Sequence, residues 1–495
     1  MSFVGAMGSR RERPLTARAL RDAVRRRQSG RSLSLHQVVL LRIARECHLP
    51  RFQTSNSGDY LHDSKSLDHS LSQLADAMSV QLELEGESTM SKVRTSSWLS
   101  TQVLDRRRWA LWVAALIAAG TFTSWGPASA TTATGGSVWA WGFNAVGQLG
   151  DGTLAMTAVP KHVRNISDVI EVQGNGDDGF ALTASGSVYD WGLGAQGNLG
   201  NGTSVPYSRV PVLVTGLSGV TAVCGAGGGS TGSGYALESN GTVWAWGYGT
   251  GGALGNGSDA SSSVPVQVSG LTNVTAIAGG GPIGGTAYAL ESDGTVWSWG
   301  VGADGELGDG SKASTSTPVQ VRGITNAVSI AAGELGGYAV LQTGTVVAWG
   351  EARIGTFQDG SALGDGSFAT TDVPVAVRKL TGITDVAAGG GEAFAVTSGG
   401  RVWAWGDGNL GNGTDNGSRV PVLLTRITGV KAVGTDISAG FALKTNGTVW
   451  SWGSSYYGEV GNGTLGGKYQ AWPEPIRGLS HVIGIAASAP FAIVG

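Results

Sequence analysis

Residues 136–142 read G-S-V-W-A-W-G, and close copies of this stretch begin at residues 186, 241, 294, 344, 400 and 447. The second aromatic position of each copy is a tryptophan, and consecutive copies of it lie 47 to 56 residues apart. These tryptophans are Trp141, Trp191, Trp246, Trp299, Trp349, Trp405 and Trp452. A period of about fifty residues predicts one structural unit that is repeated seven times.

Three further segments follow each copy in a constant order. Examples are a turn, L-G-D-G-T at 149–153, a strand, V-P-V-L-V at 210–214, and a strand pair, V-T-A-I-A-G-G with A-Y-A-L, at 274–290. In V-W-A-W, Val and Ala share one face of a strand and the two Trp share the other, so both faces need covering. Asn-Gly and Asp-Gly are strong turn signals, and no sustained helical pattern follows residue 131. The sequence predicts an all-β fold with few helices.

The two ends of the repeated region favour a closed ring over an open solenoid. The region opens with G-S-V-W-A-W-G, and it finishes with P-F-A-I-V-G at 490–495, which corresponds to the strand before that motif in other repeats. Pairing Phe491 to Val494 with Val138 to Trp141 would complete a blade and remove exposed sheet edges. We therefore predict a seven-bladed β-propeller that is closed by its N-terminal and C-terminal strands.

The repeat resembles a known family. G-T-V-W-A-W-G, together with L-G-D-G-T, the Pro-Val strand and the V-x-x-I-A-A-G type strand, is similar to the regulator of chromosome condensation repeat, over about residues 134–495. The resemblance implies a seven-bladed propeller, a fold used by a secreted bacterial inhibitor of a hydrolase and by a nuclear exchange factor for a small GTPase. The family commonly has a histidine before the A-L strand, where this chain has aromatic residues: Phe180, Tyr235, Tyr288, Tyr338, Phe394, Phe441 and Phe491.

Charge is distributed unevenly along the 495 residues, whose net charge is −3. Residues 1–130 hold 18 Lys and Arg against 11 Asp and Glu, whereas residues 131–495 hold 15 against 25. The repeated region is therefore mildly acidic, and we expect it not to bind nucleic acid through the phosphates.

Residues 90–130 have the three parts of an export signal. A positive region that ends at Arg106 to Arg108 precedes the apolar residues 109–122, and Ala128 and Ala130 frame an A-x-A cleavage site. The apolar run is too short for a stable membrane span. We predict a secreted protein, exported by the general or the twin-arginine route, whose mature domain is residues 131–495. Residues 1–89 are then an over-extended gene start, a basic cytosolic extension or part of a long leader.

The sequence offers little for metal or acid–base chemistry. The repeated turn position holds either Asp or Asn, which predicts a local turn rather than a calcium site. His162 and His481 form no metal motif, and Cys224 is expected to be a packed strand thiol. Candidate acid pairs are chain neighbours only, Asp177 with Asp178 and Glu291 with Asp293. We expect no cofactor.

One repeat departs from the others in length. From the motif's last Gly to the turn's Leu or Val the spacing is seven residues in five repeats, but 13 in the fifth and four in the sixth. The resulting insertion, residues 351–362, supplies four candidate binding residues: Arg353, Phe357, Gln358 and Asp359. Function often lies where a repeat departs from its template.

We therefore predict a monomeric, non-catalytic binding propeller whose partner is a protein or a cell-surface macromolecule. Two alternatives stay open: a regulator that promotes nucleotide exchange on a small GTPase, and a carbohydrate-active enzyme that uses paired carboxylates.

Overall fold

The computed structural model of this chain describes residues 135–228, 231–281, 285–334, 336–352, 360–408, 410–436 and 438–495. The predictions for the basic extension at 1–89 and for the signal peptide at 90–130, with Ala128 and Ala130, lie outside these residues. The one helix in the described part is the three-residue 3-10 helix η2, Thr250–Gly252. The expected scarcity of helices is thus confirmed for the described residues.

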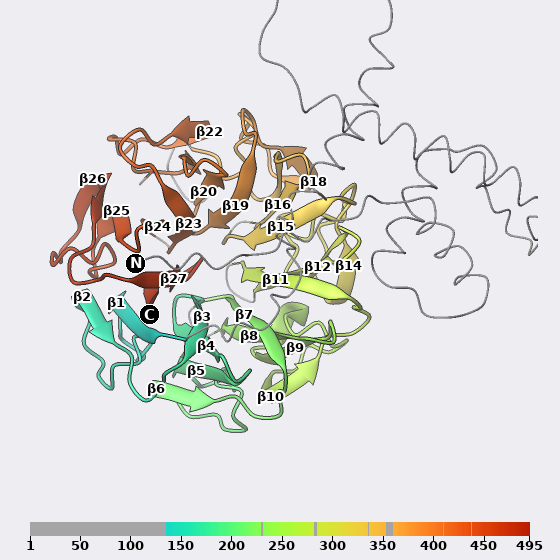
Figure 1. Ribbon diagram of the computed structural model, residues 1–495. Helices are drawn as coiled ribbons and strands as arrows, with labels where there is room; N and C mark the ends of the chain where they lie inside the picture. The colour runs from blue at the N-terminus through green and yellow to red at the C-terminus, as the bar shows by residue number, and fades with distance from the viewer. Residues whose placement is uncertain are drawn as a thin grey trace, which may run out of the picture. The chain divides into compact units, whose positions relative to one another are not determined.

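Seven antiparallel four-stranded sheets follow one another around a ring (Figure 1). Six of them use four consecutive strands each: β3 Val169–Gly174, β4 Asp178–Thr183, β5 Val188–Leu193 and β6 Tyr207–Leu213; β7 Val220–Ala226, β8 Ser233–Glu238, β9 Val243–Gly247 and β10 Ser262–Gln267; β11 Val274–Gly280, β12 Thr286–Glu291, β13 Val296–Gly300 and β14 Thr315–Gln320; β15 Ala327–Ala332, β16 Gly336–Leu341, β17 Val346–Gly350 and β18 Thr371–Ala376; β19 Ile383–Ala388, β20 Glu392–Thr397, β21 Val402–Gly406 and β22 Ser418–Leu423; β23 Val430–Thr435, β24 Ala439–Lys444, β25 Val449–Ser455 and β26 Lys468–Pro475. The predicted seven-bladed propeller is confirmed.

The seventh sheet joins the two ends of the repeated region. Its order is β2-β1-β28-β27, with β1 Ser137–Gly142, β2 Thr157–His162, β27 Val482–Ile485 and β28 Phe491–Val494. β28 pairs with Ser137 to Ala140 of β1, one residue earlier than predicted. In Figure 1 the turquoise strands β1 and β2 lie beside the red strand β27. The ring closes as the sequence predicts.

The G-x-V-W-A-W-G motif forms the third strand of each blade and supplies much of the core. In β1, Val138, Ala140 and Trp141 are buried, while Trp139 is half-buried. The Trp that precedes the last Gly of the motif is fully buried in all seven copies. Both strand faces are therefore covered, but the first Trp keeps contact with solvent.

Each buried Trp packs edge-on against the second-strand aromatic residue of the preceding blade. Ring centroids in these seven T-shaped pairs are 5.2 to 6.3 Å apart, in a range where such pairs are favourable. The pairs are Trp141–Phe441, Trp191–Phe491, Trp246–Phe180, Trp299–Tyr235, Trp349–Tyr288, Trp405–Tyr338 and Trp452–Phe394. The aromatic residues at these second-strand positions thus join the blades around the whole ring.

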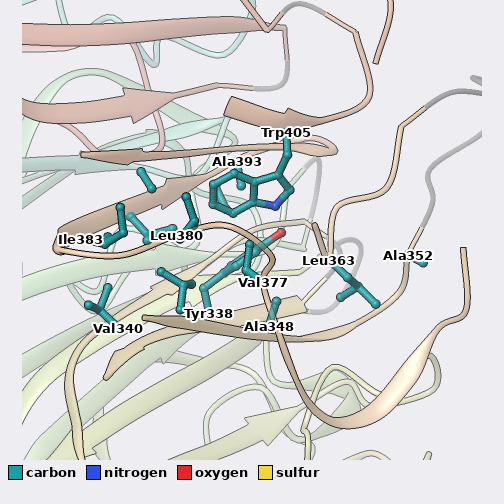
Figure 2. Packing of buried hydrophobic residues seen from close by; sticks show 14 residues of the cluster. Tyr338, Val340, Ala348, Ala352, Leu363, Val377, Leu380, Ile383, Ala393 and Trp405 are labelled. Carbon is teal, nitrogen blue, oxygen red and sulfur yellow. The ribbon is translucent and has the colours of Figure 1, made fainter. Parts of the chain in front are cut away.

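The tyrosines in these pairs also satisfy a buried carbonyl group. The carbonyl oxygen of Ala362 accepts hydrogen bonds from the Tyr338 hydroxyl, at 2.8 Å, and from the Trp405 indole N–H, at 2.7 Å. Figure 2 shows Tyr338 and Trp405 in one apolar cluster with Leu363 and Val377. A backbone group that would be costly to bury alone is therefore paired by two neighbouring blades.

The repeated Asp or Asn forms the predicted turn. In each repeat its side-chain oxygen accepts the backbone N–H of the residue two positions later, at 2.8 to 3.0 Å. These residues are Asp151, Asn201, Asn256, Asp309, Asp365, Asn412 and Asn462. Either side chain offers this oxygen, which explains why the position tolerates charged and neutral residues.

Candidate functional site

The ring has two ends that differ in their connections. We call one the loop end: it holds the connections from first to second strands, such as residues 175–177, and the start of those from third to fourth strands, such as residues 194–198. The opposite end, the hairpin end, holds the short hairpins between second and third strands, such as residues 184–187. The 351–362 insertion follows a third strand, β17, so its base lies at the loop end.

A first group of acidic residues at the loop end comes from two adjacent blades. Glu306 is buried at 3% exposure, and one of its carboxylate oxygens accepts the backbone N–H of Asp304 at 2.8 Å. Burial raises the pKa of Glu306 and of Glu334. Burial also raises the pKa of Glu351, and the negative charges of Asp304, Glu306 and Glu334 add to this effect. These carboxyl groups therefore share one acidic region.

A second acidic group links the next blades. The carboxylate of Glu392 accepts the Thr435 hydroxyl at 3.3 Å, and that of Asp436 accepts the backbone N–H of Ser438 at 2.7 Å. Burial is the main cause that raises the pKa of Asp436 to about 7, and the charge of Glu459 in the following connection contributes. The pKa of Glu392 is raised by burial and then by the charge of Asp436. Carboxyl groups from different blades thus lie near one another.

A third acidic group lies between two other blades. Asp190 stands where the other motif copies have Ala or Ser, and its carboxylate accepts the Trp246 indole N–H at 3.0 Å. Asp178 accepts the Asn175 side-chain amide at 3.1 Å, and burial chiefly raises its pKa to about 8. The pKa of Asp190 is also raised, first by burial and then by the charge of Asp178. The second oxygen of each carboxyl is buried without a hydrogen-bond partner in the described part of the chain.

Basic residues are scarce at the loop end. Among the described residues of its connections only Lys312 is basic, and Lys468 occupies the first position of β26. The connections at the hairpin end instead carry several basic residues: Arg164, Arg322, Arg378, Lys379, Arg401, Arg426 and Arg477. The loop end is thus the acidic end of the ring.

The insertion is described only at its base. The backbone N–H of Ala362 donates to the carbonyl of Ala352 at 3.0 Å, and Ala352, Ser361 and Ala362 are buried. The four predicted binding residues, Arg353, Phe357, Gln358 and Asp359, lie outside the described residues. Their role stays a prediction.

Two predictions about reactive residues can be compared with the structure. Cys224 is a buried free thiol on β7, as expected. The prediction that acid pairs occur only between chain neighbours was wrong. Glu392 and Asp436 come from different blades, and they lie close enough for the charge of Asp436 to raise the pKa of Glu392. The sequence signal for Asp190 is its place in the motif, where a carboxylate replaces Ala or Ser.

A second missed feature is the Tyr456-Tyr457 pair. It occupies a connection of normal length, so a search for length differences does not find it. Aligning the seven connections would have shown two tyrosines where others have pairs such as Ala145-Val146.

The described residues were also searched for metal sites, surface pockets and membrane-spanning helices. Within the described ranges, no group of three or more His, Cys, Asp or Glu is arranged to hold a metal ion. The lining of one surface depression includes Asp168, and that of another includes Arg378. Neither lining contains an acid pair from different blades. Of the helices that can be described, none is long and apolar enough to cross a membrane.

Comparison with known proteins identifies the repeat. Residues 135–177, 185–233, 240–283, 293–339 and 446–494 match the family model for the regulator of chromosome condensation (RCC1) repeat, and residues 383–412 match a second model of it. The chain belongs to the RCC1 repeat family. The resemblance drawn from the sequence is confirmed at this level.

The matches to relatives with RCC1 repeats cover only part of the chain and less than half of each relative. The chain is 32% identical over 186 residues to the E3 ubiquitin-protein ligase HERC2 of Homo sapiens, and the match covers 35% of this chain and 4% of that protein. It is 29% identical over 184 residues to the mitochondrial RCC1 domain-containing protein RUG3 of Arabidopsis thaliana, 35% of this chain and 39% of that protein. It is 32% identical over 108 residues to the human regulator of chromosome condensation, 21% of this chain and 25% of that protein. These relatives are eukaryotic, so the resemblance to secreted bacterial members stays a prediction.

Solved structures share the fold. Prp20p of Saccharomyces cerevisiae has a TM-score of 0.62 at 21% identity, covering 73% of this chain and 91% of that chain. Human WBSCR16 has a TM-score of 0.62 at 20% identity, covering 72% and 98%. At this identity the likeness concerns the RCC1-type propeller alone.

Proposed function

We propose that residues 131–495 form a non-catalytic, protein-binding RCC1-type propeller that acts outside the cytoplasm and binds its partner at the loop end. The observation that carries the proposal is the position of the departures from the repeat. The insertion's base and the acidic residues Glu306, Glu334 and Asp436 lie at this end, while the repeated Val, Trp and Tyr residues fill the interior. Repeated residues serve packing, so a partner is best recognised by the departures.

Known proteins of this fold support a role in protein binding. Prp20p is described by its binding properties to Gsp1p and histones, which are proteins. We extend protein binding to this chain as part of our proposal. We do not extend the identity of the partner.

The insertion is the proposed centre of the contact. Its described base at the loop end is fixed by the Ala362–Ala352 hydrogen bond and by the burial of Ser361. Arg353 and Phe357 are of the types that most often contribute to interface energy. We propose Arg353, Phe357, Gln358 and Asp359 as the contact residues.

Exchanging the insertion tests this proposal. Residues 351–362 are replaced by L-G-A-Q-G-N, the sequence of residues 193–198, and a partner is captured with the ring from the native extracellular medium. We expect the variant to fold and its affinity to fall roughly thirtyfold, the effect of losing one interface anchor. The matched control replaces the hairpin at 398–400 by T-N-G from 445–447, at the other end, and should bind normally. Equal affinity of both variants would place the contact elsewhere.

The proposed location outside the cytoplasm rests on Arg106 to Arg108, the apolar run and Ala128 with Ala130. Mass spectrometry of the culture medium is expected to find a product that begins near Thr131. A soluble cytosolic product that retains residues 1–130 would contradict this part of the proposal.

A second candidate function is favoured by the match to the human regulator of chromosome condensation over 108 residues. In that case the ring would promote nucleotide exchange on a small GTPase. Release of fluorescent GDP from a small GTPase measures this activity. We expect no acceleration, and a clear acceleration would favour the regulator over the extracellular binder.

A further inference from the structure

An exposed aromatic patch lies at the loop end, on the connection from β25 to β26. Tyr456 is 61% exposed and Tyr457 is 38% exposed. The Tyr457 ring lies 4.7 Å from the Tyr456 ring and 4.9 Å from the ring of Phe143, measured between centroids. Phe143 follows β1 in the closing sheet, so the three rings come from two neighbouring blades. We call Phe143, Tyr456 and Tyr457 the aromatic patch.

The repeat itself does not require these rings. In the first repeat the positions of the two tyrosines are Ala145 and Val146, and in the fourth they are Ala303 and Asp304. The ring packs its blades in those repeats without an aromatic pair. Large exposed apolar side chains that gather at one place usually mark an interaction site.

The backbone holds the patch in a defined arrangement. The N–H of Tyr457 donates to a carboxylate oxygen of Glu459 at 2.8 Å, and the N–H of Gly466 donates to the carbonyl of Tyr456 at 3.1 Å. A Cβ atom added at Gly458 would lie 2.7 Å from the Cα atom of Ala158, so this connection packs tightly against the closing sheet. The backbone that carries the two tyrosines is therefore held in place before any partner binds, which lowers the entropic cost of binding.

The surroundings of the patch are acidic. The Glu459 carboxylate contacts the Tyr457 backbone directly, and Asp436 is near enough for Glu459 to influence its ionisation. Asp436 in turn adjoins Glu392. Aromatic faces attract a guanidinium or ammonium group, and a nearby carboxylate adds a charge-assisted interaction. A neutral sugar could stack on the same rings, but it would gain nothing from the negative charge.

We propose that the aromatic patch, together with Glu459 and Asp436, docks an Arg or Lys side chain from a basic segment of the partner protein. This inference rests on the proposed function, because it assigns a chemical class to the partner that the loop end binds. It adds a contact that is separate from the 351–362 insertion. The partner segment should carry more than one positive charge, since the site offers the two carboxyl groups of Glu459 and Asp436.

Binding of a hexa-arginine peptide tests the inference. The labelled peptide is titrated against the purified full chain at low salt and about pH 8.5, and fluorescence anisotropy is recorded. We expect saturable binding that weakens roughly tenfold in the double variant Tyr456→Ala/Tyr457→Ala and is largely kept in Tyr456→Phe/Tyr457→Phe, which retains both rings. Tyr207→Ala, which removes a tyrosine of similar exposure (41%) from β6, is the matched control and should bind as the unchanged protein does.

Three results would overturn the inference, two of them in the peptide titration. One is an absence of saturable hexa-arginine binding, and the other is equal binding by the double alanine variant while its melting temperature stays normal. Cellohexaose, a neutral sugar, is titrated in parallel, and its binding at the tyrosines in place of the peptide would also overturn the inference. None of these results affects the insertion exchange, so the proposed function can be judged separately.

Discussion

Glu171 shows how a single carboxyl group connects two blades. It lies on β3, where one carboxylate oxygen accepts the backbone N–H of Val223 in the next blade at 3.2 Å and the other accepts the Gln173 amide at 3.2 Å. Burial is the largest cause that raises the pKa of Glu171 to about 7, and the two hydrogen bonds oppose it. The same direction holds for Asp178, Asp385 and Asp436, whose pKa values are raised to about 8, 6 and 7.

These raised pKa values predict a ring that loses stability as the pH rises. A carboxyl group with a folded pKa above its unfolded value stabilises the fold fully below the unfolded pKa, and this contribution is lost as the pH rises through the folded pKa. We expect the free energy of unfolding, from urea titrations, to fall between pH 5 and pH 8. Glu171→Gln should reduce that fall by roughly 1 kcal/mol, less than the whole shift because the side chain is half-buried. The exposed control Asp415→Asn should keep the full fall, and a pH-independent stability would contradict this account.

At the scale of the element, the Asx turn after each third strand uses an oxygen atom rather than a charge. In Asp365 one carboxylate oxygen accepts the Ser367 backbone N–H at 2.8 Å and the other accepts the Ser367 hydroxyl at 2.9 Å. Asn201 and Asn412 accept the same two groups, from Thr203 and from Thr414, with their single carbonyl oxygen. The turn should therefore work equally well with either residue.

Substitutions at Asp365 test this reading of the turn. Asp365→Asn should leave the free energy of unfolding nearly unchanged, whereas Asp365→Ala should cost about 1 kcal/mol, because the local hydrogen bonds are lost. Chemical denaturation in the presence of calcium and of a chelator is the measurement. A stabilisation by calcium that disappears in Asp365→Asn would instead indicate a metal site.

Features that depend on neighbouring residues could be predicted from the sequence, and those that depend on contacts between blades could not. The strands, the turns and the closure by Phe491 to Val494 follow from local alternation and from the repeat. The approach of Glu392 to Asp436 depends on how far two successive blades are rotated, which no single repeat encodes. Asp190 and Tyr456-Tyr457 were visible as departures from the motif, but only a comparison of residue types, rather than lengths, would have found them.

At the scale of the whole molecule, the closing sheet makes the ring cooperative. β28 lies between β1 and β27, and Phe491, which is 3% exposed, packs edge-on against Trp191 at 5.7 Å. Without β28 the N-terminal strands and β27 have no common partner. The ends of the ring would then be open sheet edges.

Removing residues 491–495 should therefore destabilise the entire ring. Burial of Phe491 alone is worth about 3 to 5 kcal/mol, and the strand pairing on both sides adds to this. We expect the thermal midpoint to fall by more than about 10 °C, while removal of Gly495 alone changes it little. A truncated ring that melts at the original temperature would mean that the blades are held together in another way.

Hydrogen–deuterium exchange of the ring with its captured partner tests whether the acidic loop end is the protein-binding end. Binding covers backbone amides at the interface, so their exchange slows. We expect slower exchange in the loop-end connections, including residues 175–177, 333–334 and 456–459, with unchanged exchange in the hairpins at 184–187 and 398–401. Slower exchange confined to those hairpins would contradict this expectation.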